Sequence, residues 1–213
     1  MARKFAEITF TPAVRAAQAH NGTRAANRRF EADPDGADSA VEGDRLGPRE
    51  AAFVAARDGF FQATVSETGW PYVQFRGGPA GFLKVLDDRT LGYADFRGNL
   101  QYISVGNLAA DDRVSLILMD QARRKRLKIW ARARVVDAAD EPELVARLAV
   151  PGYPATVERA VVLTVEALDW NCPQHITPRF TEAEVAEAVA PLRARIAELE
   201  DKLANALGYA PPG

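Results

Sequence analysis

Two arginine–glycine clusters in the sequence have the residue types needed to hold an anion. Arg76-Gly77-Gly78 comes before the stretch PAGFLKVLDDRTLGYADF, and Arg97-Gly98-Asn99 comes directly after it. A guanidinium donates paired hydrogen bonds to phosphate oxygens, and glycine lets a backbone approach a bound group closely. Lys84 and Arg126 lie on or beside other predicted strands, so four cations can converge on one phosphomonoester. The alternative is that they are four unrelated surface cations.

Other site chemistries find little support in the sequence. The single cysteine, Cys172, forms a C-x-x-H pair with His175, but a closed zinc site needs four ligands and no second pair exists. No G-x-S-x-G elbow, G-x-G-x-x-G loop or G-x-x-x-x-G-K-[ST] loop occurs. We therefore expect no metal site, and no residue is assigned as catalytic.

The composition is that of an ordinary globular protein. The chain has 213 residues, of which 47% are hydrophobic and 26% charged, and its formal net charge is −2. This balance gives no general attraction to nucleic acid or to anionic lipid, so we expect neither as a partner. One cysteine allows no disulfide within the chain, and no apolar run is long enough to span a bilayer, so we expect a cytoplasmic protein.

The pattern of apolar residues predicts a core rich in strands. The expected strands are residues 60–66, 71–76, 82–86, 90–94, 114–119, 127–136 and 159–167, and the expected helices of the core are residues 48–57, 99–108 and 141–149. Few helix-length crossovers separate these strands, which favours an antiparallel barrel or sandwich over a doubly wound sheet. We expect an N-terminal arm (1–45), a core domain (46–176) and a helical extension (177–213).

The helical extension has its own sequence signals. Thr181 and Glu184 form a T-x-x-E capping box at its start, and Pro191 is expected to kink the helix or to begin a second one. Apolar residues then recur at spacings of four and three, which is typical of a coiled-coil seam: Val185, Val189, Leu192, Ile196, Leu199, Leu203 and Ala206. This seam packs either on the core of its own chain or on the same helix of a second subunit.

Three segments, taken in order, resemble the pyridoxamine 5′-phosphate oxidase-like family of FMN-binding split barrels. They are FFQATVSETGWPYVQFRGGPAGFLKVLDDRTLGYADFRGN, SVGNLAADDRVSLILMD and RLKIWARARVV. The resemblance implies a mainly β (α+β) fold, a six-stranded antiparallel Greek-key split barrel with flanking helices. It also implies a homodimer with FMN at the subunit interface, and an FMN-dependent oxidoreductase that acts on an unidentified small molecule.

The resemblance also implies which residues hold FMN. Arg76 and Lys84 correspond to positions near the phosphate or the ribityl chain, and Arg97 and Asn99 to a turn that holds the phosphate. Arg126 corresponds to a position near the flavin, and Gln74 with the Gly77-Gly78 backbone to positions that approach its ring. Gln174 and His175 are expected to cover the flavin from the other subunit. The full implied set is Gln74, Arg76, Gly77, Gly78, Lys84, Asp95, Arg97, Asn99, Arg126, Gln174 and His175.

The sequence departs from the oxidase itself at its end. The arginine–leucine–proline ending that helps the oxidase to hold its vitamin B6 substrate is missing, and a helix stands there instead. We therefore expect a related flavoprotein and not the oxidase. The alternatives are a flavin-binding or sensor protein without turnover, and a split barrel that binds haem or another anionic ligand.

Overall fold

The computed structural model describes residues 3–31, 43–170 and 173–207. The chain divides into two units, one formed by residues 1–120 and 125–174 and the other by residues 121–124 and 175–213. Cys172, one half of the C-x-x-H pair, lies outside the described residues.

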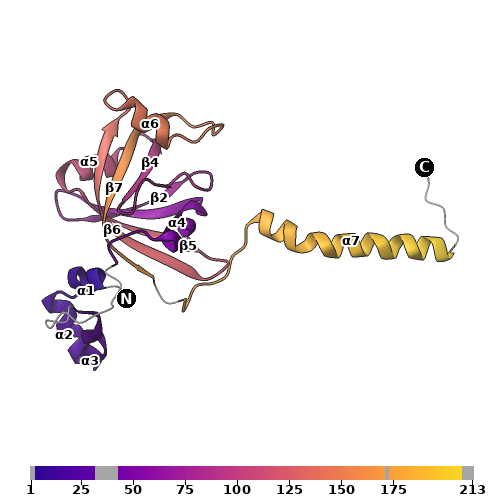
Figure 1. The fold of residues 1–213 in the computed structure, drawn as a ribbon, viewed down its shortest axis with the longest axis horizontal. Coiled ribbons are helices and arrows are strands. Elements are labelled where there is room, and N and C mark those ends of the chain that lie inside the picture. The colour runs from indigo at the N-terminus through magenta and orange to yellow at the C-terminus, as the bar shows by residue number, and fades with distance from the viewer. Residues whose placement is uncertain (1–2, 32–42, 171–172, 208–213) are drawn as a thin grey trace. The chain divides into compact units, whose positions relative to one another are not determined.

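The first unit is built on one antiparallel sheet (Figure 1). Over the described residues the sheet has seven strands in the order β2-β1-β5-β6-β7-β4-β3. The strands are β1 (Gly59–Val65), β2 (Pro71–Gly77), β3 (Lys84–Val85), β4 (Thr90–Phe96), β5 (Arg113–Asp120), β6 (Lys125–Asp137) and β7 (Val157–Trp170). The predicted antiparallel, mainly β fold with flanking helices is confirmed. The strand expected at residues 82–86 is present only as the two-residue β3, beside six longer strands.

The sheet curls so that its two sides meet through side chains. The hydroxyl of Tyr93 on β4 donates a hydrogen bond of 2.8 Å to Oε1 of Gln62 on β1. Arg76 on β2 and Asp95 on β4 form an ion pair with an N–O distance of 2.6 Å. Because β2 and β4 are not neighbours in the sheet order, the barrel is split between them.

Large apolar side chains fill the interior of the barrel. Leu116, Ile129 and Leu163, one from each of β5, β6 and β7, are fully buried. Phe60 stacks on Phe82 with ring centroids 5.6 Å apart. Burying one such side chain contributes about 1.5–3 kcal/mol, so this cluster holds the curled sheet in shape.

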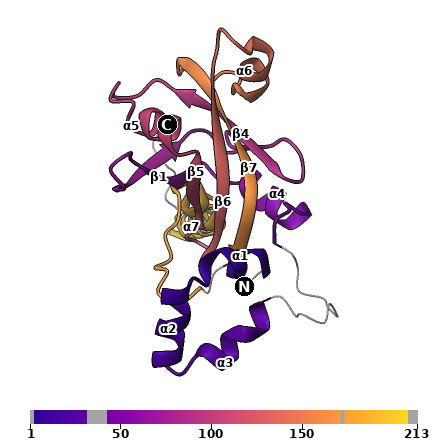
Figure 2. The same cartoon turned by 90° about the vertical axis from the view of Figure 1, so that its left-hand side faces the viewer.

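Helices cover the ends and one outer face of the sheet. They are α1 (Arg3–Thr9), α2 (Pro12–His20), α3 (Arg24–Asn27), the 3-10 helix η1 (Arg28–Phe30), α4 (Pro48–Ala55), α5 (Ile103–Ala110) and α6 (Pro142–Leu148). Helices α1–α3 lie at one end of the long strands β6 and β7, and α6 lies at the other (Figures 1 and 2). Phe5 of α1 packs on Trp130 with ring centroids 5.2 Å apart, which ties the N-terminal segment to β6.

Helix α5 begins later than the sequence predicts. The prediction placed its start at Asn99, but the helix begins at Ile103. Leu100 and Tyr102 have φ angles of 63° and 51°, in the left-handed region that side chains disfavour. These two residues belong to an irregular loop, so the prediction of a helix across residues 99–102 is wrong.

The second unit contains α7 (Glu182–Leu207), a single helix with Pro191 inside it. The predicted capping box is confirmed: the Thr181 hydroxyl accepts a hydrogen bond from the Glu184 N–H at 3.2 Å, and the Glu184 carboxylate accepts one from the Thr181 N–H at 2.8 Å. Of the described helices, none combines the length and the apolar character needed to cross a membrane.

Candidate functional site

A cleft of about 310 Å³ opens at the split of the barrel. Residues of β2, β4, the loop 97–102, the first turn of α5 and the beginning of β7 line it. Strand β2 alternates between half-buried and exposed side chains. Its half-buried set, Tyr72, Gln74 and Arg76, lines the cleft together with Phe75 and Gly77 at the end of the strand. The hydroxyl of Ser104 donates to the Gln74 amide oxygen at 2.9 Å, which joins α5 to this wall.

Asp95 lies between two arginines at the floor of the cleft. Its carboxylate is 2.6 Å from Arg76 and 3.4 Å from Arg159, and the residue is only 5% exposed. Burial raises the pKa of Asp95 above its ordinary value, although the positive charges of Arg76 and Arg159 act in the opposite direction. The three charges form a buried network that holds β2 and β7 against β4.

Glu158 forms a second node nearer the solvent. Its carboxylate pairs with Arg97 and with Arg159, each at 2.9 Å, and accepts a hydrogen bond from the Tyr102 hydroxyl at 3.2 Å. The hydrogen bond from Arg97 lowers the pKa of Glu158, so this carboxylate is ionised near neutral pH. Three arginines and two carboxylates line the cleft, which leaves a formal excess of one positive charge.

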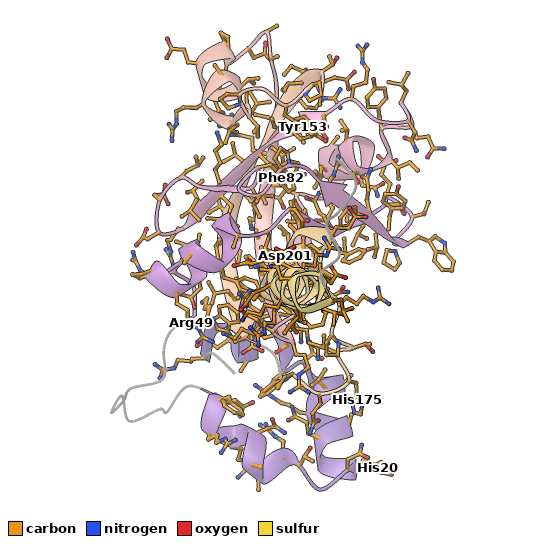
Figure 3. The ribbon with its side chains drawn as sticks, turned by 90° about the vertical axis from the view of Figure 1, so that its right-hand side faces the viewer. His20, Arg49, Phe82, Tyr153, His175 and Asp201 are labelled. Atoms are coloured by element: carbon orange, nitrogen blue, oxygen red, sulfur yellow. The ribbon has the colours of Figure 1, made fainter. Side chains whose placement is uncertain are left out.

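Aromatic rings form the apolar part of the cleft. The Phe82 and Phe96 rings lie 6.4 Å apart, and the Phe96 and Tyr153 rings lie 5.1 Å apart, so the three make a continuous row. Figure 3 labels the two outer members of this row, Phe82 and Tyr153. The guanidinium of Arg159 lies 4.9 Å from the centre of the Tyr102 ring, so charge and aromatic surface adjoin.

The cleft brings together six of the residues that the sequence analysis selected. They are Gln74, Arg76, Gly77, Asp95, Arg97 and Asn99. Gln74, Arg76 and Gly77 come from β2, Asp95 from β4, and Arg97 and Asn99 from the loop after β4. The site therefore contains residues of both arginine–glycine clusters. The convergence of these two clusters on one site is therefore a property of the fold.

Three other selected residues lie elsewhere in the first unit. A Cβ on Gly78 would stand 2.7 Å from the Phe82 ring, so this glycine allows close packing of a core side chain. The Lys84 ammonium donates to the carbonyls of Arg147 and Ala149 at 2.7 and 3.0 Å, where it caps the end of α6. Arg126 lies on β6 opposite Met119, and its Nε is buried. None of the three lines the cleft.

Gln174 and His175 lie in an exposed turn at the boundary between the two units. His175 has a φ of 61°, in the left-handed region. Their expected position over a flavin of the other subunit stays a prediction. Among the residues with described positions, no group of three or more histidine, cysteine, aspartate or glutamate side chains is placed to hold a metal ion.

Several residues of the cleft were not predicted from the sequence, above all Arg159 and Glu158. Arg159 faces Asp95 in the pairing of β7 with β4, so a correct alignment of these two predicted strands would have placed it beside a selected residue. Tyr102 had no such signal, because it lies in the irregular loop that was predicted as helix.

A curled antiparallel barrel, split beside an arginine-lined cleft, defines a class of split-barrel proteins. The family described as Pyridoxamine 5'-phosphate oxidase matches residues 46–170, which is more than half of the chain. The chain therefore belongs to this family. None of the curated proteins compared with the chain matches it significantly.

Several solved structures resemble the chain at low sequence identity. HupZ of Group A Streptococcus is 16% identical with a TM-score of 0.48, and the match covers 63% of this chain and 100% of that one. A putative pyridoxamine 5'-phosphate oxidase from Lactobacillus delbrueckii is 20% identical with a TM-score of 0.46, covering 59% and 94%. An FMN-binding protein from Syntrophomonas wolfei is 13% identical with a TM-score of 0.43, covering 56% and 81%.

Proposed function

We propose that the cleft binds FMN and that the protein is an FMN-dependent oxidoreductase of a small molecule. The observation that carries the proposal is the meeting of three arginines with a row of aromatic rings at the split of a barrel of this family. The cleft, at about 310 Å³, falls in the size range of small-molecule sites. When bound, FMN supplies the electron transfer, and the residues of the chain bind and orient it.

The side chains of the cleft suit the two chemical parts of FMN. Guanidinium groups bind phosphate, and aromatic rings offer surface to a flat ring system. Nε of Arg76 is buried and has no hydrogen-bond partner within the described part of the chain, so this arginine has a donor beyond its ion pair with Asp95. The residues present therefore fit the cofactor.

Arg97 is the proposed phosphate ligand among the three arginines. Its side chain is 60% exposed and, among the residues with described positions, forms its ion pair only with Glu158, whereas Arg76 and Arg159 are at most 15% exposed. An exposed arginine reorients toward an incoming anion at low cost, because it gives up one solvent-screened ion pair. Arg76 and Arg159 stay with Asp95 and shape the cleft.

The proposed functional state is a homodimer in the cytoplasm with FMN at the subunit interface. Its support is an outer patch on β1, β2 and β5, formed by Phe61, Val73, Phe75 and Ile117, which are 37–60% exposed. Phe61 lies opposite both Phe75 and Ile117, so the patch is continuous, and Phe75 also lines the cleft. A second copy docked on this patch would stand at the edge of the cleft.

The first test is spectroscopic. Purified protein incubated with FMN and passed through a desalting column should retain yellow colour, with absorbance near about 450 nm from oxidised flavin. Bleaching by NADH or NADPH would support an oxidoreductase. A flavin that is retained but not reduced by any donor would point to a flavin-binding protein without turnover, and failure to retain FMN would overturn the proposal.

The second test uses two matched arginine variants. Arg97→Ala should weaken FMN binding roughly ten- to a hundredfold, because it removes a charge-assisted hydrogen bond to the phosphate. Arg113→Ala is the control, since Arg113 is also exposed and paired with a carboxylate, that of Asp111, but lies outside the cleft. Equal affinity in both variants would refute the phosphate role of Arg97.

The third test concerns the homodimer. Val73→Asp places a charge in the outer patch without changing the cleft lining, and it should lower FMN affinity if the cleft needs a second subunit. Wild-type affinity in this variant at low protein concentration would contradict an interface at the patch.

A further inference from the structure

Helix α7 presents an apolar seam along its length. Within the second unit, the apolar face is open: 48–63% of the surface of each of its larger side chains is exposed, namely Val185, Leu192, Ile196, Leu199 and Leu203. Isolated helices are marginal in water, so most helices gain their stability from packing of the apolar face. The seam therefore needs a partner, and its details indicate which one.

The seam follows a heptad repeat with a specific choice of residues. Its spacings of four and three assign Val189, Ile196 and Leu203 to the a positions and Val185, Leu192, Leu199 and Ala206 to the d positions. Two of the three a residues are β-branched, and leucine occupies the two central d positions. Among parallel coiled coils, this combination favours two strands over three or four.

The charges beside the seam favour the same arrangement. Arg195 occupies a g position and Glu200 the e position of the next heptad. In a parallel pair these positions of opposite helices face each other, so two attractive Arg195–Glu200 pairs form across the seam. In the antiparallel pair that aligns a with d residues, g faces g and e faces e. The repulsive Arg195–Lys202 contacts on one side of the seam are then offset by attractive Arg193–Glu200 contacts on the other, so the charges give no net attraction.

The proline of α7 is compatible with this packing. Pro191 falls at a c position, on the side of the helix away from the seam. Figure 3 looks nearly along α7 and shows side chains radiating on all sides, with Asp201, at an f position, labelled. A helix packed on the core of its own chain would not need complementary charges at e and g.

We propose that α7 pairs with α7 of a second copy of the chain as a parallel two-stranded coiled coil. Such a pair has a twofold axis along the seam, which is the symmetry of a closed homodimer. The proposal rests on residues 185–206 alone, so it does not depend on flavin binding. The coiled coil supplies a dimer contact separate from the outer patch of the barrel.

Cysteine cross-linking in the full chain tests the pairing and its direction. In a Cys172→Ser background, Leu199→Cys places one thiol at a d position and Asp201→Cys places one at an f position. Opposing d residues of a parallel pair meet the separation of about 4.4–6.8 Å between Cα atoms that a disulfide needs, and f residues do not. Oxidised glutathione should therefore convert most Leu199→Cys protein into a covalent dimer and leave Asp201→Cys protein mainly uncrosslinked.

Charge reversal tests the register. Added to the Leu199→Cys protein, Arg195→Glu should reduce cross-linking severalfold, and Arg195→Glu combined with Glu200→Arg should restore it. The double reversal restores the attraction between residues 195 and 200 of opposite helices. It does not restore the ion pair that Arg195 makes with Glu198 in its own helix, so recovered cross-linking would report the contact between helices.

Three results would each overturn the proposal. The first is no cross-link in the Leu199→Cys protein, and the second is equal cross-linking in the Leu199→Cys and Asp201→Cys proteins. The third is preferred cross-linking between Ile196→Cys and Leu199→Cys chains when the two are mixed, because that pairing of a with d belongs to an antiparallel coiled coil.

Discussion

Arg76 and Asp95 face each other across the split of the barrel, with Nη1 and Oδ1 2.6 Å apart and both side chains at most 15% exposed. The pair joins β2 to β4, which no backbone ladder connects. Arg159 approaches the other carboxylate oxygen of Asp95 at 3.4 Å, so one carboxylate holds two arginines at the floor of the cleft. The cleft therefore has a buried, ion-paired floor and, at Arg97, an exposed rim.

The Arg76–Asp95 pair should be important for stability. Removing one partner of a buried ion pair leaves an uncompensated charge, so Asp95→Ala or Arg76→Ala should each cost about 3 kcal/mol of unfolding free energy in urea titrations. The double variant should cost clearly less than the sum, since neither charge of the pair is left without its partner and Arg159 keeps its ion pair with Glu158.

The control for this cycle is the pair of Arg132 and Asp112, at 2.8 Å and about half exposed on both sides. Exposed pairs contribute at most about 1 kcal/mol, so its single and double variants should stay within that range. Additive costs at Arg76 and Asp95 would show that the two residues do not interact.

Glu158 should act as a competitor for the cofactor phosphate, because it occupies Arg97 in the absence of a ligand. Glu158→Gln should therefore raise FMN affinity severalfold, measured by flavin fluorescence quenching. Glu166→Gln is the matched control, since Glu166 pairs with exposed Arg132 and does not line the cleft. A loss of affinity in Glu158→Gln would mean that Glu158 orients Arg97 and does not compete.

The sequence predicts the strands well because their signals are local. Alternating β-branched and aromatic residues mark β1 and β2, and the turn at Gly69, whose φ is 85°, joins them into the expected hairpin. The fold class follows, since short turns between strands leave no room for parallel crossovers. The antiparallel arrangement was therefore within reach of the sequence alone.

The remainder of the site depends on contacts that local patterns do not encode. Arg159 joins Asp95 through the register of β7 against β4, and Lys84 caps α6 through an approach of residues far apart in the chain. Two left-handed residues, Leu100 and Tyr102, break a pattern that otherwise fits a helix. The residue types in the two arginine–glycine clusters predicted an anion site near them. Which cations lie close together there depends on the folded barrel.

Two glycines of the first unit should respond to alanine in opposite ways. A Cβ at Gly92 would stand 2.9 Å from Leu148 of α6, so Gly92→Ala should destabilise the protein by about 1–3 kcal/mol through overpacking. A Cβ at Gly106, inside α5, would meet no atom within 4 Å. Gly106→Ala should stabilise the protein by about 0.5–1 kcal/mol through helix propensity. Thermal unfolding of both variants checks the contrast, and a neutral Gly92→Ala would show that α6 does not press on β4.

Tyr93 should make the protein sensitive to alkali. Burial raises its pKa from 10.0 to about 12, although the positive charge of Arg76 acts in the opposite direction. The folded chain therefore keeps the phenol proton where the unfolded chain has lost it. The contribution of Tyr93 to the free energy of unfolding is fully present below pH 10 and falls between pH 10 and pH 12. Above that range the free energy of unfolding is lower by roughly 2–3 kcal/mol.

Ultraviolet titration of tyrosinate in the wild type and in Tyr93→Phe isolates this group. The difference between the two titrations should show one phenol that ionises near pH 12 or only on unfolding. Tyr93→Phe should lose about 1 kcal/mol at neutral pH, because the Gln62 oxygen loses its donor. Above pH 10, the free energy of unfolding of the Tyr93→Phe variant should fall less steeply than that of the wild type. A difference titration centred near pH 10 would mean that Tyr93 is open to solvent and that the barrel is not closed around the Tyr93–Gln62 hydrogen bond.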